Sequence, residues 1–297
     1  WYNSGTLKGF KVNPAGAWST GGPMNTARYN LAGSGTQTSA LGFGGTLDPP
    51  VSALAESYNG STWTEVGDLN EARYGIAGVG ASNTAALAFG GYTGTARSVN
   101  TETWAGSSWT EVANLNTGRN ALAGAGASNT AALAFGGASS TGKTETWNGS
   151  GWTEVADLNT ARYSLAGSGT YTSALAYGGF ASPRTSNTET WNGTSWTEVN
   201  NLNTVRDNLM GVGANNTSAL CIGGYTNTEV NLANTELWNG TAWSEVSDLA
   251  IGVRTSGAAG TSTAAISFAG VNPSAGRVAV SEEWDVPKNT TVSITVS

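Results

Sequence analysis

Pairs of glutamates that lie nine residues apart are the groups in this sequence best suited to chemistry. In the stretch TETWNGSGWTEV, residues 144–155, Glu145 and Glu154 lie on either side of an Asn-Gly turn. The same spacing gives four further pairs: Glu56 with Glu65, Glu102 with Glu111, Glu189 with Glu198, and Glu236 with Glu245. Two carboxylates about 5 Å apart could be the acid and the nucleophile of a retaining glycosidase. They could also hold a divalent cation, although calcium takes about 6–8 oxygen ligands.

A structural role is the third interpretation of these pairs. Like charges directly opposite each other on two strands are unfavourable unless a cation bridges them, and an active site is seldom built five times in one protein. One arginine per repeat stays in phase with the glutamates, and Glu282 keeps that phase in the last repeat; the arginines are Arg28, Arg73, Arg119, Arg162, Arg206 and Arg254. A guanidinium can bind carboxylates through its fork of N–H groups. We therefore expect a structural Glu-Arg-Glu lattice rather than a catalytic or metal site.

The composition excludes several classes of function. The chain of 297 residues has no histidine and one cysteine, Cys221, so it cannot form a Ser-His-Asp triad, a zinc site of the His/Cys type or an internal disulfide. Its net charge of -7, without a run of Lys or Arg, argues against nucleic acid as a partner. No apolar stretch reaches the roughly 18 residues of a membrane span, so we expect no membrane insertion. We also expect no cofactor.

An internal repeat organises the whole chain. A Gly-Gly or Ala-Gly pair recurs at 44–45, 90–91, 136–137, 178–179, 223–224 and 269–270, which gives spacings of 46, 46, 42, 45 and 46 residues. Six copies at this period fill the sequence, and such periods are typical of propellers and solenoids. We expect a single domain over residues 1–297.

Each repeat contains four short runs with the patterns of strands. In one copy these are ARYSLAGSG, TSALAYGG, TETW and WTEV. The second run is small and apolar, as in a strand buried on both faces, and Asn-Gly between the third and fourth runs indicates a hairpin. In that hairpin Trp147 lies directly opposite Trp152, and Glu145 opposite Glu154. The pattern predicts an all-β fold, a six-bladed β-propeller of four-stranded antiparallel blades.

Two tryptophans close most of the repeats. They are Trp104 and Trp109, Trp147 and Trp152, Trp191 and Trp196, and Trp238 and Trp243. A buried strand that ends in Gly-Gly, then these two aromatic positions, then an Arg opening the next copy, resembles the kelch repeat. The nearly unvaried TETWNGTSWTEV and LNTAR are most similar to kelch-like proteins of marine bacteriophages and marine metagenomes. The resemblance covers essentially the whole chain and implies a propeller. Kelch propellers serve as interaction modules, enzyme domains and structural proteins alike, so the resemblance implies no single function.

The two ends of the chain can be placed in part. The last repeat loses its second Trp, whereas the first repeat is preceded by an unpartnered GAWST. We expect the strand around Trp18 to complete the last blade beside the strand ending at Trp284, which is the ring closure that the kelch resemblance implies. Residues 1–14 form an N-terminal extension outside the pattern. The alternating tail, residues 291–297, has no partner within the ring and could pair with another chain.

The loops between the second and third strands carry the individual character of each repeat. The loops between the first and second strands are nearly constant, and binding sites tend to occupy the individual loops of a rigid scaffold. The candidate ligand-binding residues in the variable loops are Tyr92, Phe180, Tyr225, Arg97, Lys143, Arg184, Arg277, Asp48 and Glu229. Aromatic rings among neutral polar side chains suit carbohydrate, although the rings could also simply fill the ends of the blades.

Two classes of function remain. The first is a non-catalytic recognition module on a virion exterior, of the phage fibre or decoration type, that binds a host-surface glycan or protein. The second is a purely structural subunit of a virion, fibre or extracellular filament, assembled through the uniform face and the C-terminal strand with other such proteins or with copies of itself. The phage-like resemblance favours an exterior virion protein and leaves both classes open. An enzyme is disfavoured because the histidine ligands of a copper-radical oxidase and the Asp-box repeats of a sialidase are missing.

Overall fold

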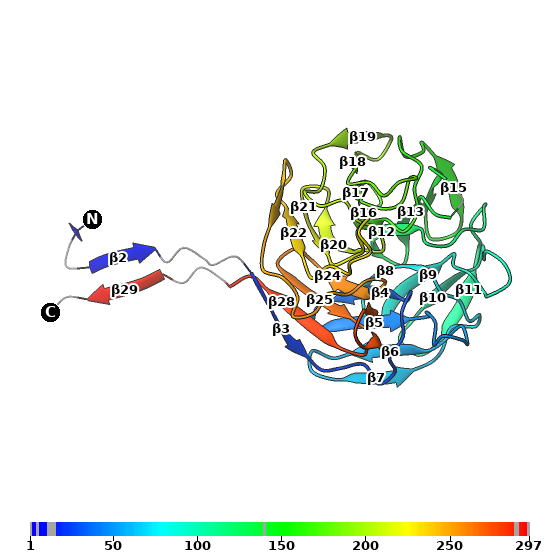
Figure 1. Ribbon diagram of the computed structural model, residues 1–297, viewed down its shortest axis with the longest axis horizontal. Coiled ribbons are helices and arrows are strands. Elements are labelled where there is room, and N and C mark those ends of the chain that lie inside the picture. Colours follow the sequence, from blue (N-terminus) through cyan, green and yellow to red (C-terminus); the bar gives the residue numbers. More distant parts are fainter. Residues whose placement is uncertain (1, 4–5, 11–15, 139–140, 288–290, 296–297) are drawn as a thin grey trace.

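Six four-stranded antiparallel sheets surround one axis in the computed structural model (Figure 1). It describes residues 2–3, 6–10, 16–138, 141–287 and 291–295, and for residues 2–3, 6–10 and 291–295 only the backbone. The described residues form strands, turns and loops without an α-helix, so none of them belongs to a helix that could cross a membrane. The predicted all-β, six-bladed β-propeller is confirmed.

The strands of each blade are paired in chain order from the axis outwards. The first blade contains β4 (Ala32–Thr36), β5 (Ser39–Phe43), β6 (Ala55–Tyr58) and β7 (Trp63–Val66). The second and third contain β8 (Ala77–Ser82), β9 (Ala85–Phe89), β10 (Thr101–Trp104), β11 (Trp109–Val112), β12 (Ala123–Ser128), β13 (Ala131–Phe135), β14 (Thr144–Trp147) and β15 (Trp152–Val155). The fourth and fifth contain β16 (Ala166–Thr170), β17 (Ser173–Tyr177), β18 (Thr188–Trp191), β19 (Trp196–Val199), β20 (Met210–Asn215), β21 (Ser218–Ile222), β22 (Thr235–Trp238) and β23 (Trp243–Glu245). The first strands of neighbouring blades pack together around the axis.

The last blade closes the ring with a strand from the other end of the chain. It contains β24 (Gly257–Gly260), β25 (Ala264–Phe268), β28 (Ser281–Asp285) and β3 (Ala17–Gly21), and a short ribbon of β26 (Val271–Asn272) and β27 (Gly276–Arg277) fills its variable loop. Trp284 lies opposite Trp18, with ring centroids 5.5 Å apart, so the predicted closure is confirmed.

The second strand of each blade is buried on both faces, as its composition predicts. In β9, Ala86, Leu87, Ala88 and Phe89 all have 0% exposure. The first strands instead alternate glycine with small side chains because they crowd together at the axis. A Cβ atom at Gly33 would lie 2.3 Å from the carbonyl oxygen of Ala258 in the neighbouring blade, so only glycine lets the two strands approach this closely.

The outer hairpin of each blade has the predicted register. Trp147 pairs with Trp152 and their ring centroids are 5.4 Å apart. The turn between them is held by the side-chain oxygen of Asn148, which accepts hydrogen bonds from the backbone N–H groups of Ser150 at 2.9 Å and Gly151 at 3.0 Å. Gly149 has a φ of 92°, which glycine adopts without strain. The Asn-Gly pair therefore forms the turn of this hairpin.

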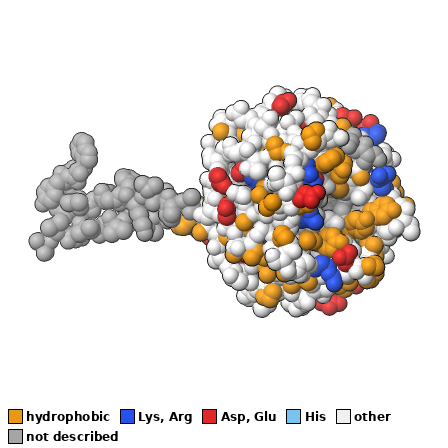
Figure 2. Space-filling model, in the orientation of Figure 1, with side chains coloured by type: hydrophobic (Ala, Val, Ile, Leu, Met, Phe, Trp, Pro, Cys, Tyr) orange, Lys and Arg blue, Asp and Glu red, His pale blue; other side chains and the backbone are white. Residues whose placement is uncertain are grey.

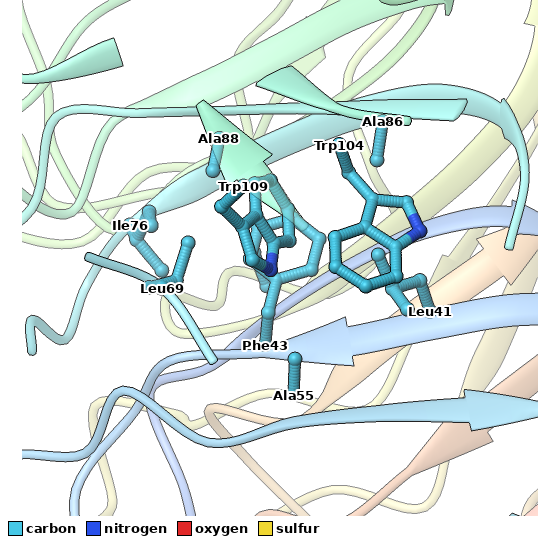
Figure 3. Packing of buried hydrophobic residues seen from close by; sticks show 10 residues of the cluster. Leu41, Phe43, Ala55, Leu69, Ile76, Ala86, Ala88, Trp104 and Trp109 are labelled. Atoms are coloured by element: carbon cyan, nitrogen blue, oxygen red, sulfur yellow. The ribbon is translucent and has the colours of Figure 1, made fainter. Parts of the chain in front are cut away.

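The second tryptophan of each hairpin fastens its blade to the preceding one. Figure 3 shows Trp109 beside Phe43 of the first blade, with ring centroids 4.9 Å apart. In the other blades its counterpart also donates a hydrogen bond from Nε1 to a hydroxyl of the preceding blade; the pairs are Trp152 with Thr101, Trp196 with Thr144, Trp243 with Thr188, Trp18 with Thr235, and Trp63 with Ser281. Trp109 is the exception. The corresponding position is Ala55, and the buried Nε1 of Trp109 has no hydrogen-bond partner among the described residues.

A small separate sheet joins the two ends of the chain. It contains β1 (Tyr2–Asn3), β2 (Thr6–Phe10) and β29 (Thr291–Thr295) in the order β1-β2-β29, and it projects from the ring in Figure 1. The C-terminal tail thus has a partner strand in its own N-terminal extension, antiparallel from Thr6 opposite Thr295 to Phe10 opposite Thr291. Sequence alone assigned it none. The pairing with a second chain stays a prediction.

Candidate functional site

Each of the first five blades buries one carboxylate of the predicted pair against an arginine. Glu145 on β14 is 1% exposed, and its Oε1 lies 2.8 Å from Nη2 of Arg119, which is equally buried. The equivalent ion pairs are Arg28 with Glu56 at 2.7 Å, Arg73 with Glu102 at 3.0 Å, Arg162 with Glu189 at 3.2 Å, and Arg206 with Glu236. Burial lowers the pKa of the Arg119 guanidinium, and the Glu145 carboxylate opposes this shift.

The segment that links one blade to the next provides further hydrogen bonds to the buried carboxylate. Asn116 donates to Glu145 from its backbone N–H at 2.8 Å and from its side-chain Nδ2 at 2.8 Å. The same Nδ2 also donates to the carbonyl oxygen of Trp152 at 3.2 Å. Through Asn116, the link is therefore hydrogen-bonded to both the inner and the outer strand of the next hairpin. A buried charge is tolerated when it is paired and hydrogen-bonded in this way.

The outer glutamate of each pair is not part of this arrangement, which corrects the predicted Glu-Arg-Glu lattice. Glu154 lies opposite Glu145 in the ladder, but it is exposed and its Oε2 accepts from Nζ of Lys143 at 3.0 Å. Its counterparts Glu65, Glu111, Glu198 and Glu245 are also exposed, on the outermost strands. The strand register places the two carboxylates side by side, but the segment that links the blades covers only the inner strand.

The last blade departs from the pattern, and the assignment of Arg254 to the lattice is wrong by one residue. Val253 holds the lattice position: its carbonyl oxygen accepts from Gly224 N–H as that of Arg206 accepts from Gly179 N–H. Glu282 is 8% exposed and pairs with no arginine among the described residues, and its carboxylate accepts from the backbone N–H of Ala250 at 2.9 Å. Burial therefore raises the pKa of Glu282.

These findings place the two carboxylates of each pair in opposite environments, one buried and one exposed. In each of the first five blades one carboxylate is neutralised by a buried guanidinium and the other is in solvent. Among the residues that the structure describes, no three Asp, Glu, Cys or His side chains cluster closely enough to hold a metal ion.

The face that carries the loops between second and third strands, here called the variable face, is where the blades differ. At this face the residue after each lattice position pairs with the residue after the Gly-Gly or Ala-Gly pair. The pairs are Tyr29 with Thr46, Tyr74 with Tyr92, Asn120 with Ala138, Tyr163 with Phe180, Asp207 with Tyr225, and Arg254 with Val271. The backbone is the same in every blade, whereas the side chains range from aromatic to acidic and basic.

A closed ring of backbone hydrogen bonds holds the centre of this face. Asn30, Gly75, Ala121, Ser164, Asn208 and Thr255 each have φ between 51° and 59°, and each N–H donates to the carbonyl of its counterpart in the preceding blade at 2.7–2.9 Å. The left-handed conformation is unusual for the five that are not glycine, so the ring closure itself holds it. The opposite, uniform face opens on an axial cavity of about 260 Å³ lined by Gly, Ala, Ser, Val and Thr residues.

Three predicted ligand residues come together between the fourth, fifth and sixth blades. The Arg184 guanidinium carbon lies 5.8 Å from the Phe180 ring centroid and 4.8 Å from that of Tyr225. Arg184 also forms an ion pair with the buried Asp207, from Nε to Oδ1 at 2.8 Å. Arg254, which does not belong to the lattice, also lies over Tyr225, with its guanidinium carbon 4.1 Å from the ring centroid.

The other predicted ligand residues are spread around the variable face. Asp48 and Arg277 belong to neighbouring loops of the first and last blades and line one cavity. Tyr92 packs on Tyr74 with ring centroids 5.5 Å apart, and its backbone pairs with the exposed Arg97. The last two stand apart from these groups: Lys143 contacts Glu154, and Glu229 is exposed in the loop of the fifth blade.

A cavity of about 360 Å³ lies on the variable face where the fifth, sixth and first blades meet. Its lining includes Tyr29, Asp48, Asn208, Arg254 and Arg277. The phenol of Tyr29 donates to Oδ1 of Asp48 at 3.0 Å, and the pKa of Tyr29 is raised by burial and by this carboxylate. Arg277 donates from Nη1 to the carbonyl oxygen of Leu47 and so joins the loops across the ring closure.

The residues that sequence reasoning missed occupy the position directly after the lattice. They are Tyr29, Tyr74, Tyr163, Asp207 and Arg254. A signal was present, because this position varies in size and charge directly after an arginine that is present in five of the six repeats. The face seen in Figure 2 is mostly uncharged, so the few charged groups near its middle are conspicuous.

No model of a known protein family matches this chain, and no curated protein is similar to it in sequence.

Proposed function

We propose that this propeller is a non-catalytic recognition module that binds a host-surface glycan or protein through its variable face. One observation carries the proposal: side-chain diversity is concentrated on one face of a scaffold whose strand pairing repeats in every blade. A structural subunit needs no such diversity, whereas a recognition surface does. Half-exposed aromatic rings beside charged and amide groups are suited to sugar rings and their hydroxyls.

The finer parts of the proposal rest on sequence resemblance. The repeats are proposed to be of the kelch type because of their Gly-Gly, paired aromatic and Arg positions. The proposed location is the exterior of a virion, as a fibre or decoration protein, because the repeats are most similar to those of marine phage proteins. The lack of catalysis is supported by the glutamates, since every buried one in the first five blades is held by an arginine.

A glycan array probed with the full chain tests this function. The test variant replaces Tyr92, Phe180 and Tyr225 with alanine, and the matched control replaces the exposed Thr84, Thr130 and Thr217 of the uniform face with alanine. We expect the first variant to lose binding and the control to keep it. Thermal unfolding of both variants separates loss of binding from loss of fold. Equal binding by a folded variable-face variant would contradict the proposal.

A purely structural role is the second candidate, favoured by the sheet outside the ring. In the order β1-β2-β29, one edge of β29 has no partner among the described strands, and a free edge can add a strand from another chain. Sedimentation of the full chain and of a chain ending at residue 290 tests this role. Assemblies that form only with the tail present, together with no ligand for the variable face, would favour it over recognition.

A further inference from the structure

The cavity at the meeting of the fifth, sixth and first blades contains a guanidinium whose charge nothing in the described structure balances. We propose that Arg254 and Arg277 form a subsite there for the anionic group of a saccharide, a carboxylate or a sulfate. This subsite rests on the proposed recognition function and names its ligand class. The subsite is indicated by the position of Arg254, the state of its N–H groups, and the lining of the cavity.

The repeat pattern itself sets Arg254 apart. In the first five blades an arginine sits below the surface against a glutamate, and the residue after it is tyrosine, asparagine or aspartate. In the last blade Val253 takes the buried position and the arginine moves one residue along, to the variable face. A cation thus replaces the neutral or acidic residue that every other blade has at this point.

The two arginines that contact Tyr225 differ in their electrostatic balance. Arg184 forms an ion pair with Asp207 at 2.8 Å, so its charge is neutralised. Arg254 lies closer to the ring, at 4.1 Å, yet its guanidinium forms no ion pair or hydrogen bond with any described residue. Stacking on an aromatic face leaves the N–H edge of a guanidinium available, and that fork matches a carboxylate or a sulfate.

The cavity lining adds hydrogen-bonding groups of the kind that sugars use. Asn30 and Asn208 line it, and their side-chain amides make no hydrogen bond to described residues, while Asp48 keeps an acceptor beside Tyr29. Arg254 and Arg277 outnumber the single carboxylate of Asp48, in a protein whose net charge is -7. The volume of about 360 Å³ is near the lower end of small-ligand pockets, which run to about 1,000 Å³, and suits one sugar ring.

Binding of defined probes to the full chain tests the subsite. The probes are a uronic acid oligosaccharide, a sulfated galactose oligosaccharide, a neutral glucose oligosaccharide and poly-L-glutamate. We expect one anionic saccharide to bind in a salt-sensitive manner, and Arg254→Gln to weaken it on the order of tenfold or more, since a hydrogen bond to a charged group is lost. The control, Thr130→Gln, introduces the same side chain at an exposed position of the uniform face and is expected to leave affinity unchanged.

The outcomes separate the subsite from the function on which it rests. The carboxylate and sulfate probes identify the anionic group. Unchanged affinity in Arg254→Gln, equal binding of the neutral sugar, or tighter binding of poly-L-glutamate with the same dependence on Arg254 would each overturn the saccharide subsite. If binding of the anionic saccharide is lost in the Tyr92, Phe180 and Tyr225 variant but unchanged in Arg254→Gln, the subsite fails and the recognition function stands. If neither variant alters any binding, both fail.

Discussion

The missing hydrogen bond of Trp109 can be restored by one substitution, Ala55→Thr. In four other blades a threonine at this position accepts from the tryptophan Nε1 of the next blade at 3.0–3.1 Å. Ser281 does the same for Trp63 at 3.1 Å. Ala55 has 0% exposure, and the Trp109 Nε1 is buried without a partner in the described part of the chain. The contact between the first and second blades therefore lacks the hydrogen bond that the other contacts have.

The expected gain in the free energy of unfolding is about 1 kcal/mol. A hydrogen bond adds roughly 0.5–1.5 kcal/mol net, and a buried unsatisfied donor costs roughly 1–3 kcal/mol. The extra atoms of threonine offset part of this gain if the site cannot accommodate them. The equivalent threonines fit against a tryptophan in the same position, so this offset is small. Ala55→Ser, which adds one oxygen, is the variant with the least demand for space.

A double-mutant cycle with Trp109→Phe isolates the hydrogen bond, measured as the shift in the midpoint of thermal and urea unfolding. We expect Ala55→Thr to raise the melting temperature by about 2 °C in the wild-type background and to have no stabilising effect beside Phe. Thr101→Ala, which deletes the equivalent acceptor for Trp152, is the matched control and is expected to lower stability by a similar amount. The same gain in both backgrounds would refute the reasoning.

Three further predictions concern the glutamates. Arg119→Met should lower the free energy of unfolding by about 3–5 kcal/mol because it leaves Glu145 buried without its partner, and urea unfolding measures this loss. Glu154→Gln should change stability by no more than about 0.5 kcal/mol in the same assay, because that carboxylate is exposed; a large loss would show that the outer glutamate belongs to the lattice after all. Glu282→Gln should stabilise the protein at neutral pH. Because the folded pKa of Glu282 is raised, the wild type gains stability relative to this variant as pH falls through the folded value, and the difference disappears below the ordinary glutamate pKa. A difference that does not vary with pH would contradict the assigned burial.

The fold was predictable because its determinants are local and repeated. The Asn-Gly turn, the period of two along Thr144 to Trp147, and the buried run of β9 each specify their own strand and register. The opposed Trp147 and Trp152 therefore followed from residue spacing alone. Ring closure was predictable too, since a missing strand at one end matched a spare strand at the other.

The candidate site was predictable only in part, because its chemistry depends on what covers each strand. Glu145 and Glu154 are equivalent in the ladder, yet the link that contains Asn116 covers one and leaves the other in solvent. Arg254 keeps the spacing of the lattice arginines within one residue, and only the backbone bonding of Val253 shows that it belongs to the variable face. A shift of the arginine by one residue does not change the repeat period, so the period does not reveal it.

By itself, the sequence determined the number of blades, the strands within them, the cross-strand pairs and the face on which variation would gather. Tertiary structure alone decided which carboxylates are buried, which arginine is free, that Arg277 reaches the carbonyl oxygen of Leu47, and that β29 pairs with β2. The physical reason is the range of the interactions. Turns and strand pairing depend on neighbours a few residues away, whereas burial and charge balance depend on segments that meet only when the ring closes.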